Sequence, residues 1–123
     1  MTRPFRALLI DDDPDLLMLT RRTLEFTAGW EVFTAPAGAQ GLELARSVTP
    51  DVILVDVMMP AMDGYEVCRR VKADPTTAHV PVVLLTARRE SDEAHWRATG
   101  AAGVLLKPFR PDALAQEIRA LCP

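Results

Sequence analysis

Cysteine and histidine are scarce in this chain of 123 residues, and this argues against disulfides and zinc. The two cysteines, Cys68 and Cys122, form no CxxC pair and have no histidine at a spacing typical of zinc ligands. We therefore expect two reduced thiols. His79 and His95 are isolated in the sequence, without a paired nucleophile or ligand, so each is expected at the surface.

Long apolar runs and an excess of positive charge are also missing. The longest apolar stretch, Val80 to Leu85 counting Pro81, is far shorter than the roughly 20 residues that a membrane-spanning helix needs. No signal-peptide apolar region follows Met1–Phe5. A net charge of −3 argues against direct contact with nucleic acid. We expect a cytoplasmic protein with neither a membrane nor a nucleic acid as partner.

The composition that is present is that of one globular domain. Hydrophobic residues make up 49% of the chain and charged residues 25%, which is typical of a folded protein. A chain of this length buries roughly two-thirds of its unfolded surface, enough for a core without disulfides or metals. The sequence has no internal repeat and no linker, so we expect one domain over residues 1–123.

Five short apolar runs alternate with five longer segments of helical period. The expected strands are Ala7–Ile10, Glu31–Ala35, Val52–Val55, Val82–Leu85 and Val104–Leu106. The expected helices are Pro14 to about Thr27, Gly38–Ser47, Tyr65–Lys72, Ser91–Thr99 and Pro111–Leu121. Because consecutive parallel strands need right-handed helical crossovers, the pattern predicts an α/β, doubly wound (βα)5 sandwich. Its parallel sheet should have the strand order 2-1-3-4-5, with helices on both faces.

Polar side chains follow four of the five predicted strands. These residues are Asp11, Asp12 and Asp13 after the first strand, Asp56 after the third, Thr86 after the fourth and Lys107 after the fifth. The second strand ends in Ala35-Pro36-Ala37 and should lie at the edge of the sheet. Since the carboxyl ends of parallel strands meet at one side of the sheet, we expect the polar set to converge there.

The acidic residues after the first strand divide into two groups. Asp13-Pro14-Asp15 reads as a helix start, with an N-cap, a proline at the first position and an acid favoured by the helix dipole. Asp11 and Asp12 precede the cap and are not explained by it. Two carboxylates about 4 Å apart repel by roughly 4 kcal/mol at an effective dielectric of 20. With Asp56 added, the cluster predicts a bound cation, and oxygen-only ligands suit Mg²⁺.

The remaining residues suggest phosphoryl chemistry. Asp56, held by a rigid strand beside Mg²⁺, can attack phosphorus and form an acyl phosphate. Lys107 can meet a phosphoryl oxygen as a point charge, and Thr86 can donate its hydroxyl to another. Taken singly, Lys107 is equally a solvated strand end and Thr86 a strand-terminating hydroxyl. Their joint placement after neighbouring strands favours the phosphoryl site.

Several motifs in order resemble the receiver domain of two-component response regulators, the chemotaxis-regulator fold. The matching segments are Leu8-Leu9-Ile10-Asp11-Asp12-Asp13, Asp56-Val57-Met58-Met59-Pro60-Ala61-Met62-Asp63-Gly64, Leu85-Thr86-Ala87 and Leu106-Lys107-Pro108-Phe109. The resemblance covers the whole chain. It implies a domain for phosphorelay signal transduction that is phosphorylated on Asp56 and is not a stand-alone enzyme.

The resemblance also implies roles for individual residues. Asp11, Asp12 and Asp56 would hold Mg²⁺, with Mn²⁺ as a substitute, and the backbone carbonyl of Met58 would complete the coordination. Thr86 and Lys107 would contact the phosphoryl group. The Lys107–Pro108 peptide bond would be cis, and Asp63-Gly64 would form the turn before the third helix.

The partners that the resemblance implies are a sensor histidine kinase or a histidine phosphotransfer protein. The signal would pass to a downstream protein, or to an output domain of the same protein if the chain is part of a longer regulator. A homodimer that depends on phosphorylation is a further expectation.

One position departs from the family pattern. Receivers usually have Tyr or Phe three residues before the lysine, where this chain has Val104. The chemistry of the site is unaffected, but the usual aromatic switch is placed in doubt. Trp96, on the preceding helix, is a candidate substitute, although a buried or surface packing role is the favoured interpretation.

Two other functions use similar residues or the same topology. An aspartate-nucleophile phosphohydrolase generally carries a second acid two residues after the nucleophile, where this chain has Met58. It would also need a lid segment to exclude water. A flavin-binding domain would need a phosphate loop after the first strand, where three acids would repel the phosphate. Both are less favoured than a receiver.

Overall fold

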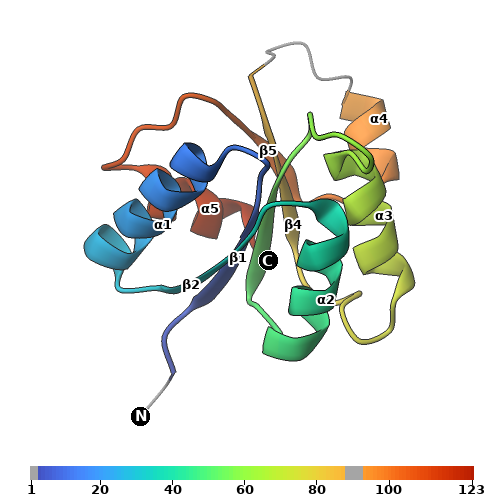
Figure 1. Cartoon of the computed structure of the whole chain (residues 1–123), viewed down its shortest axis with the longest axis horizontal. Helices are drawn as coiled ribbons and strands as arrows, with labels where there is room; N and C mark the ends of the chain where they lie inside the picture. Colours follow the sequence, from blue (N-terminus) through green and yellow to red (C-terminus); the bar gives the residue numbers. More distant parts are fainter. Residues whose placement is uncertain (1–2, 88–92) are drawn as a thin grey trace.

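In the computed structural model, which describes residues 3–87 and 93–123, five parallel strands form one sheet (Figure 1). The strands are β1 (Arg6–Ile10), β2 (Glu31–Ala35), β3 (Val52–Asp56), β4 (Val82–Thr86) and β5 (Gly103–Leu106). Their order in the sheet is β2-β1-β3-β4-β5, and every neighbouring pair is parallel. The predicted fold class and strand order are confirmed.

Helices cover both faces of this sheet. They are α1 (Pro14–Ala28), α2 (Gly38–Val48), α3 (Gly64–Ala73), α4 (Glu93–Ala98) and α5 (Leu114–Leu121). Figure 1 shows α1 and α5 on one face and α2, α3 and α4 on the other. None of the helices within the described residues has both the length and the apolar composition needed to cross a bilayer.

The core consists of two layers, one on each face of the sheet, because side chains alternate along each strand. On β1, Leu8 and Ile10 pack on the side of α2 and α3, while Ala7 and Leu9 pack on the side of α1 and α5. Every residue of β3 and β4 is buried, as expected for central strands covered on both faces. The strand that carries Asp56 is thus among the most enclosed parts of the molecule.

The start and end of α1 follow the predicted signals. The Asp13 carboxylate accepts hydrogen bonds from the backbone N–H groups of Asp15 and Leu16, at 3.0 and 3.3 Å. Pro14 is the first helical residue. Gly29 ends the helix with a left-handed backbone (φ 69°), and its N–H donates to the carbonyl of Glu25. The Asp13 cap, at the first turn of α1, fixes the acidic turn next to the site.

The boundaries of two helices differ from expectation or lie partly outside the described residues. The prediction that the last helix begins at Pro111 is wrong, because α5 begins at Leu114. The backbone N–H of Ala113 donates to the carbonyl of Arg110 at 3.1 Å, so residues 111–113 form a turn before the helix. The predicted start of the fourth helix at Ser91 lies outside the described residues, and α4 is described from Glu93.

Both cysteines are free thiols, as predicted. Cys68 is fully buried in α3, and its thiol donates a hydrogen bond to the carbonyl of Thr99. Cys122 is half-buried near the last described residue. Burial raises the pKa of both thiols, which disfavours the reactive thiolate.

Candidate functional site

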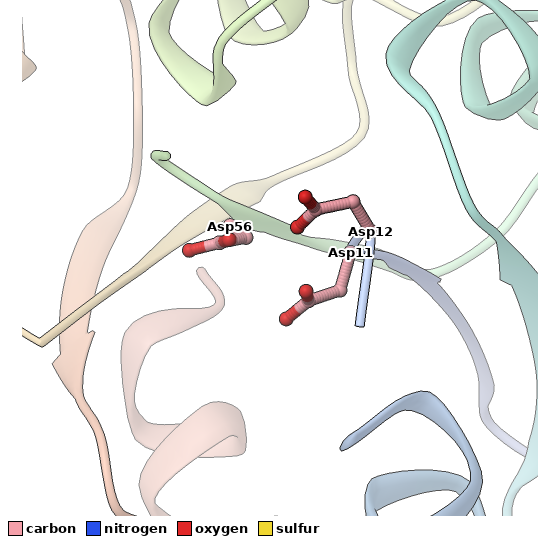
Figure 2. Close-up of side chains that lie close together, drawn as sticks. All are labelled: Asp11, Asp12 and Asp56. Carbon is pink, nitrogen blue, oxygen red and sulfur yellow. The ribbon is translucent and has the colours of Figure 1, made fainter. Parts of the chain in front are cut away.

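Three carboxylates meet at the carboxyl edge of the sheet (Figure 2). Asp11 and Asp12 follow the last residue of β1, and Asp56 is the last residue of β3. One oxygen from each lies within 4.8 Å of the others. Asp11 and Asp56 are buried and Asp12 is exposed, so the cluster has an inner and an outer side. Neighbouring parallel strands bring these residues together as the sequence predicts.

Among the described residues, Lys107 is the cation that pairs with this cluster. Its ammonium lies 2.9 Å from Oδ2 of Asp11 and 3.2 Å from Oδ1 of Asp56. The backbone N–H of Lys107 donates to the carbonyl of Thr86 at 2.8 Å, which ties the residue to the end of β4. The Lys107–Pro108 peptide bond is cis, as the resemblance implied. One ammonium therefore bridges two of the three predicted acids.

Thr86 ends β4 beside these groups. It is 6% exposed, and its register partner on β5 is Leu106, the residue before Lys107. The residue before it, Leu85, is the register partner of Asp56 on β3. The parallel sheet thus places Thr86 at the same edge as the acids and the lysine.

Asp11 is held by two donors of the protein. The backbone N–H of Asp13 donates to its Oδ1 at 3.0 Å, while Lys107 occupies Oδ2. The backbone N–H of Asp11 itself donates to the carbonyl of Ala35 at the end of β2. Both carboxylate oxygens of Asp11 are thus already bonded within the protein.

The segment after Asp56 approaches the carboxylate from a second side. The backbone N–H of Met58 hydrogen-bonds to the Asp56 carboxylate, while the Met58 side chain is exposed. Gly64, at the start of α3, donates its N–H to the carbonyl of Val57 at 3.0 Å. An ideal Cβ at Gly64 would lie 2.6 Å from the carbonyl oxygen of Asp56, so only glycine fits this approach.

The pKa values of Asp56 and Lys107 both lie above their ordinary values. Burial, and then the negative charge of Asp11, raise the pKa of Asp56, although Lys107 and the Met58 N–H oppose the shift. Burial alone would lower the pKa of Lys107, but the hydrogen bond and charge of Asp11, followed by Asp56, raise it. A further cation at the site would favour the ionised form of Asp56.

The donor set fits a divalent cation that prefers oxygen. Two carboxylates that lie within 4.8 Å of each other repel by at least about 3 kcal/mol at an effective dielectric of 20. Against three acids, the ammonium of Lys107 leaves an excess of negative charge. Oxygen ligands without nitrogen or sulfur suit Mg²⁺, which binds through one or two carboxylates and keeps several waters.

Two residues of the site were not singled out by their chemistry in the sequence. The backbone N–H of Asp13 donates a hydrogen bond to the carboxylate of Asp11, although the sequence indicated only a helix cap at Asp13. Gly64 was read as part of a turn, and its close approach to Asp56 was not foreseen. No local pattern reveals such a contact, because it depends on how α3 packs against the end of β3.

At the position of the missing aromatic residue, Val104 packs with Trp96 against the core layer on the α3 side. Trp96 is half-buried, and the guanidinium of Arg97 lies 5.2 Å from the centre of its ring. Trp96 and Val104 also line one hollow, so a ring from a helix rather than from the strand borders the space at this position.

Fold and site together define a class of protein: small, doubly wound α/β domains with an acidic cluster, a hydroxyl and a lysine at the carboxyl edge of the sheet. The model of the response regulator receiver domain matches residues 7–119. The chain belongs to the family of response regulator receiver domains, the signalling domains of two-component systems, in which histidine kinases are the partners.

Similar curated proteins are longer than this chain. The chain is 40% identical over 117 residues to the DNA-binding dual master transcriptional regulator RpaA of Synechocystis, with 94% of this chain and 48% of that protein covered. It is 42% identical over 119 residues to the response regulator PleD of Caulobacter vibrioides, with 94% and 26% covered. The chain thus spans about half or a quarter of the length of these relatives.

Solved structures of similar domains share the fold along their whole length. The chemotaxis protein CheY4 of Vibrio cholerae superposes with a TM-score of 0.91 at 32% identity, covering 97% of this chain and 99% of that one. The receiver domain of a Pseudomonas aeruginosa sensor histidine kinase superposes with a TM-score of 0.85 at 26% identity, covering 98% of each chain. That structure holds a magnesium ion in its active-site cleft.

Proposed function

We propose that Asp56 accepts a phosphoryl group from a sensor histidine kinase or a histidine phosphotransfer protein. The observation that carries the proposal is the position of Asp56, at the end of a buried strand with Lys107 at 3.2 Å and two further acids within 4.8 Å. An oxygen of the Asp56 carboxylate attacks phosphorus as the bond from phosphorus to the donor's histidine nitrogen breaks, and the electron pair stays on that nitrogen.

The other residues of the site hold the group in place. We assign Mg²⁺ to Asp11, Asp12 and Asp56 with the backbone carbonyl of Met58, and Mn²⁺ as a substitute. When bound, the ion neutralises phosphoryl charge. Because both oxygens of Asp11 are already bonded, Asp12 and Asp56 are assigned as the direct ligands and Asp11 as a ligand through water.

Lys107 and Thr86 are assigned to the phosphoryl oxygens. The ammonium of Lys107 already lies beside the nucleophile, and Thr86 ends the neighbouring strand at the same edge. A charge-assisted contact from Lys107 and a hydroxyl hydrogen bond from Thr86 would favour the negative charge that develops on these oxygens. The exposed Met58 side chain offers no acid or base for a phosphohydrolase.

Residues 1–123 are proposed to act as one receiver domain. Phosphorylation would change its surface, and that change would be read by a downstream protein or by an output domain of a longer regulator. The greater length of the relatives supports the second arrangement. A homodimer that forms on phosphorylation is part of the proposal.

The test is phosphorylation by acetyl phosphate in the presence of Mg²⁺, followed by intact-mass spectrometry. The protein should gain one phosphoryl group that is stable in acid and labile in base, and EDTA should prevent the gain. Asp56→Asn should abolish it, whereas the control Asp15→Asn, an exposed acid of the first turn of α1, should not. An undiminished adduct in Asp56→Asn would refute the assignment.

A further inference from the structure

Helix α4 is loosely attached to the rest of the domain. None of its six described residues is buried, and Trp96 is the half-buried one. Helix α3, in contrast, buries Gly64, Val67, Cys68 and Val71. An element with little buried surface opens or shifts more easily than its neighbours. Within the part of the chain that the structure describes, α4 is therefore held with little buried surface.

Two of these contacts join α4 and the turn after it to α3. The ring of His95 meets the ring of Tyr65 edge to face, with centroids 4.4 Å apart and planes at 83°. The thiol of Cys68 donates to the carbonyl of Thr99 at 3.3 Å. Tyr65 and Cys68 are three residues apart and share one face of α3. The first contact lies at the start of α3 and the second lies one turn further on.

The start of α3 is packed directly against the strand end that carries Asp56. Tyr65 follows Gly64, whose N–H donates to the carbonyl of Val57. The space for a Cβ at Gly64 is filled by the backbone of Asp56 and Val57, so no gap separates the two segments. Since close-packed segments move together, a displacement of the β3 end displaces Tyr65 as well.

On its other side, α4 faces open space. A hollow of about 540 Å³ lies between α4, β5 and α5, and its walls include Trp96, Val104, Leu106 and Leu121. The valine at position 104 leaves this space wider than an aromatic side chain would. Helix α4 thus has contacts on the α3 side and room to move on the β5 side.

We propose that the contact between Tyr65 and His95 is a latch that holds α4 against α3, and that a phosphoryl group at Asp56 releases it. This inference rests on the function proposed above. Displacement of the β3 end would draw Tyr65 away from His95 and let α4 shift over the hollow, carrying Trp96 with it. Phosphorylation would then be coupled to the position of α4 through α3, and no aromatic side chain at position 104 would be needed.

Thermodynamic linkage between the Tyr65–His95 contact and the phosphoryl site makes the latch measurable. If a phosphoryl group breaks the contact, part of its binding free energy is used to break it. Removing the contact by mutation must then strengthen the binding of a phosphoryl mimic by the factor that corresponds to the energy of the contact. Edge-to-face ring pairs have interaction energies that correspond to roughly two- to tenfold in an equilibrium. His95→Ala should therefore bind beryllofluoride two- to tenfold more tightly in the presence of Mg²⁺, measured by ¹⁹F NMR. His79→Ala, an exposed histidine elsewhere, is the matched control and should bind as the wild type does.

A mutant cycle separates the latch from other effects of these residues. Tyr65→Leu keeps an apolar side chain but removes the ring contact. The double variant with Tyr65→Leu and His95→Ala should therefore bind beryllofluoride no more tightly than either single variant. In a Trp30→Phe background, the fluorescence reports Trp96. There His95→Ala alone should shift the emission in the same direction as beryllofluoride shifts it with His95 intact.

The outcomes distinguish the latch from the proposed function. Bound beryllofluoride in the wild type, with equal or weaker binding in His95→Ala, overturns the latch and leaves the function standing. Additive effects of Tyr65→Leu and His95→Ala also overturn it, because the two residues then act separately. No bound beryllofluoride in the wild type refutes the proposed function, and the latch with it.

Discussion

Replacing Gly64 with alanine tests whether α3 and the end of β3 that carries Asp56 are in direct backbone contact. A glycine-to-alanine change that the backbone tolerates stabilises a protein by about 0.4–1 kcal/mol. At Gly64, however, the new Cβ would lie 2.6 Å from the carbonyl oxygen of Asp56 and 2.9 Å from Cα of Val57. These are backbone atoms of a buried segment and cannot rotate away. We expect Gly64→Ala to destabilise the fold by about 1–3 kcal/mol instead.

The expected change in melting temperature follows from the size of the domain. An unfolding entropy of about 2.1 cal/mol/K per residue implies that each kcal/mol lowers the Tm by roughly 4 °C for a chain of this length. Gly64→Ala should therefore melt about 4–12 °C below the wild type in differential scanning calorimetry. Because the clash is relieved only by moving the end of β3, phosphorylation by acetyl phosphate should also slow.

Gly38 provides a matched control, since it is likewise the first residue of its helix. A Cβ there would meet side-chain atoms, 2.9 Å from Cγ2 of Val67 and 3.0 Å from Sδ of Met62. The Met62 side chain can change rotamer and the Val67 methyl belongs to a side chain rather than to the backbone, so Gly38→Ala should cost less than Gly64→Ala and leave the phosphorylation rate unchanged. Equal losses in the two variants, or a gain in Gly64→Ala, would show that backbone contact does not position Asp56.

Two further predictions concern charge. In EDTA, Asp12→Ala should melt less than about 4 °C above the wild type, because Asp12 is exposed and its repulsion is screened. Mg²⁺ at ten times its Kd should raise the Tm of the wild type by about 5 °C, and Asp12→Ala should lose this rise. An equal Mg²⁺-dependent rise in both proteins would contradict Asp12 as a ligand. Burial raises the pKa of Asp51, but hydrogen bonds from the Arg6 N–H and from Arg3 outweigh it, so the pKa of Asp51 is lowered in the folded protein. The ionised carboxylate therefore stabilises the fold above its ordinary pKa, and this stabilisation is lost as the pH falls through the lowered pKa. Asp51→Asn should therefore cost about 1 kcal/mol at pH 7 and little in strong acid, whereas the exposed control Asp112→Asn should change the Tm at neither pH.

Much of the fold could be predicted because the strands carry strong local signals. The segments 52–55 and 82–85 are unbroken runs of aliphatic residues, and both prove to be central strands buried along their length. Polar residues after the strand ends then identified the edge of the sheet where Asp11, Asp12 and Asp56 meet. This inference worked because the geometry of a parallel sheet, rather than side-chain detail, brings these residues together.

The features that the sequence did not reveal depend on contacts between distant elements. Pro111 looked like the first residue of a helix, but a turn closed by Ala113 on Arg110 delays the start of α5. Lys107 was expected at a phosphoryl group, and it pairs with Asp11 and Asp56. The ring contact between Tyr65 and His95 joins residues thirty positions apart, and His95 was expected to be isolated at the surface. Such pairs follow from how helices pack, which no local pattern encodes.

The complete burial of β3 and β4 has a consequence for the timescales of motion in this domain. Amide hydrogens of these strands should exchange with solvent only when the whole chain unfolds, because no local opening exposes them. Those of α4, which has no buried residue among the six described, should exchange through small fluctuations many times faster. Asp56 is thus mounted on a strand that should exchange among the slowest of the described residues, while α4, which contacts Tyr65, should change its position far more often.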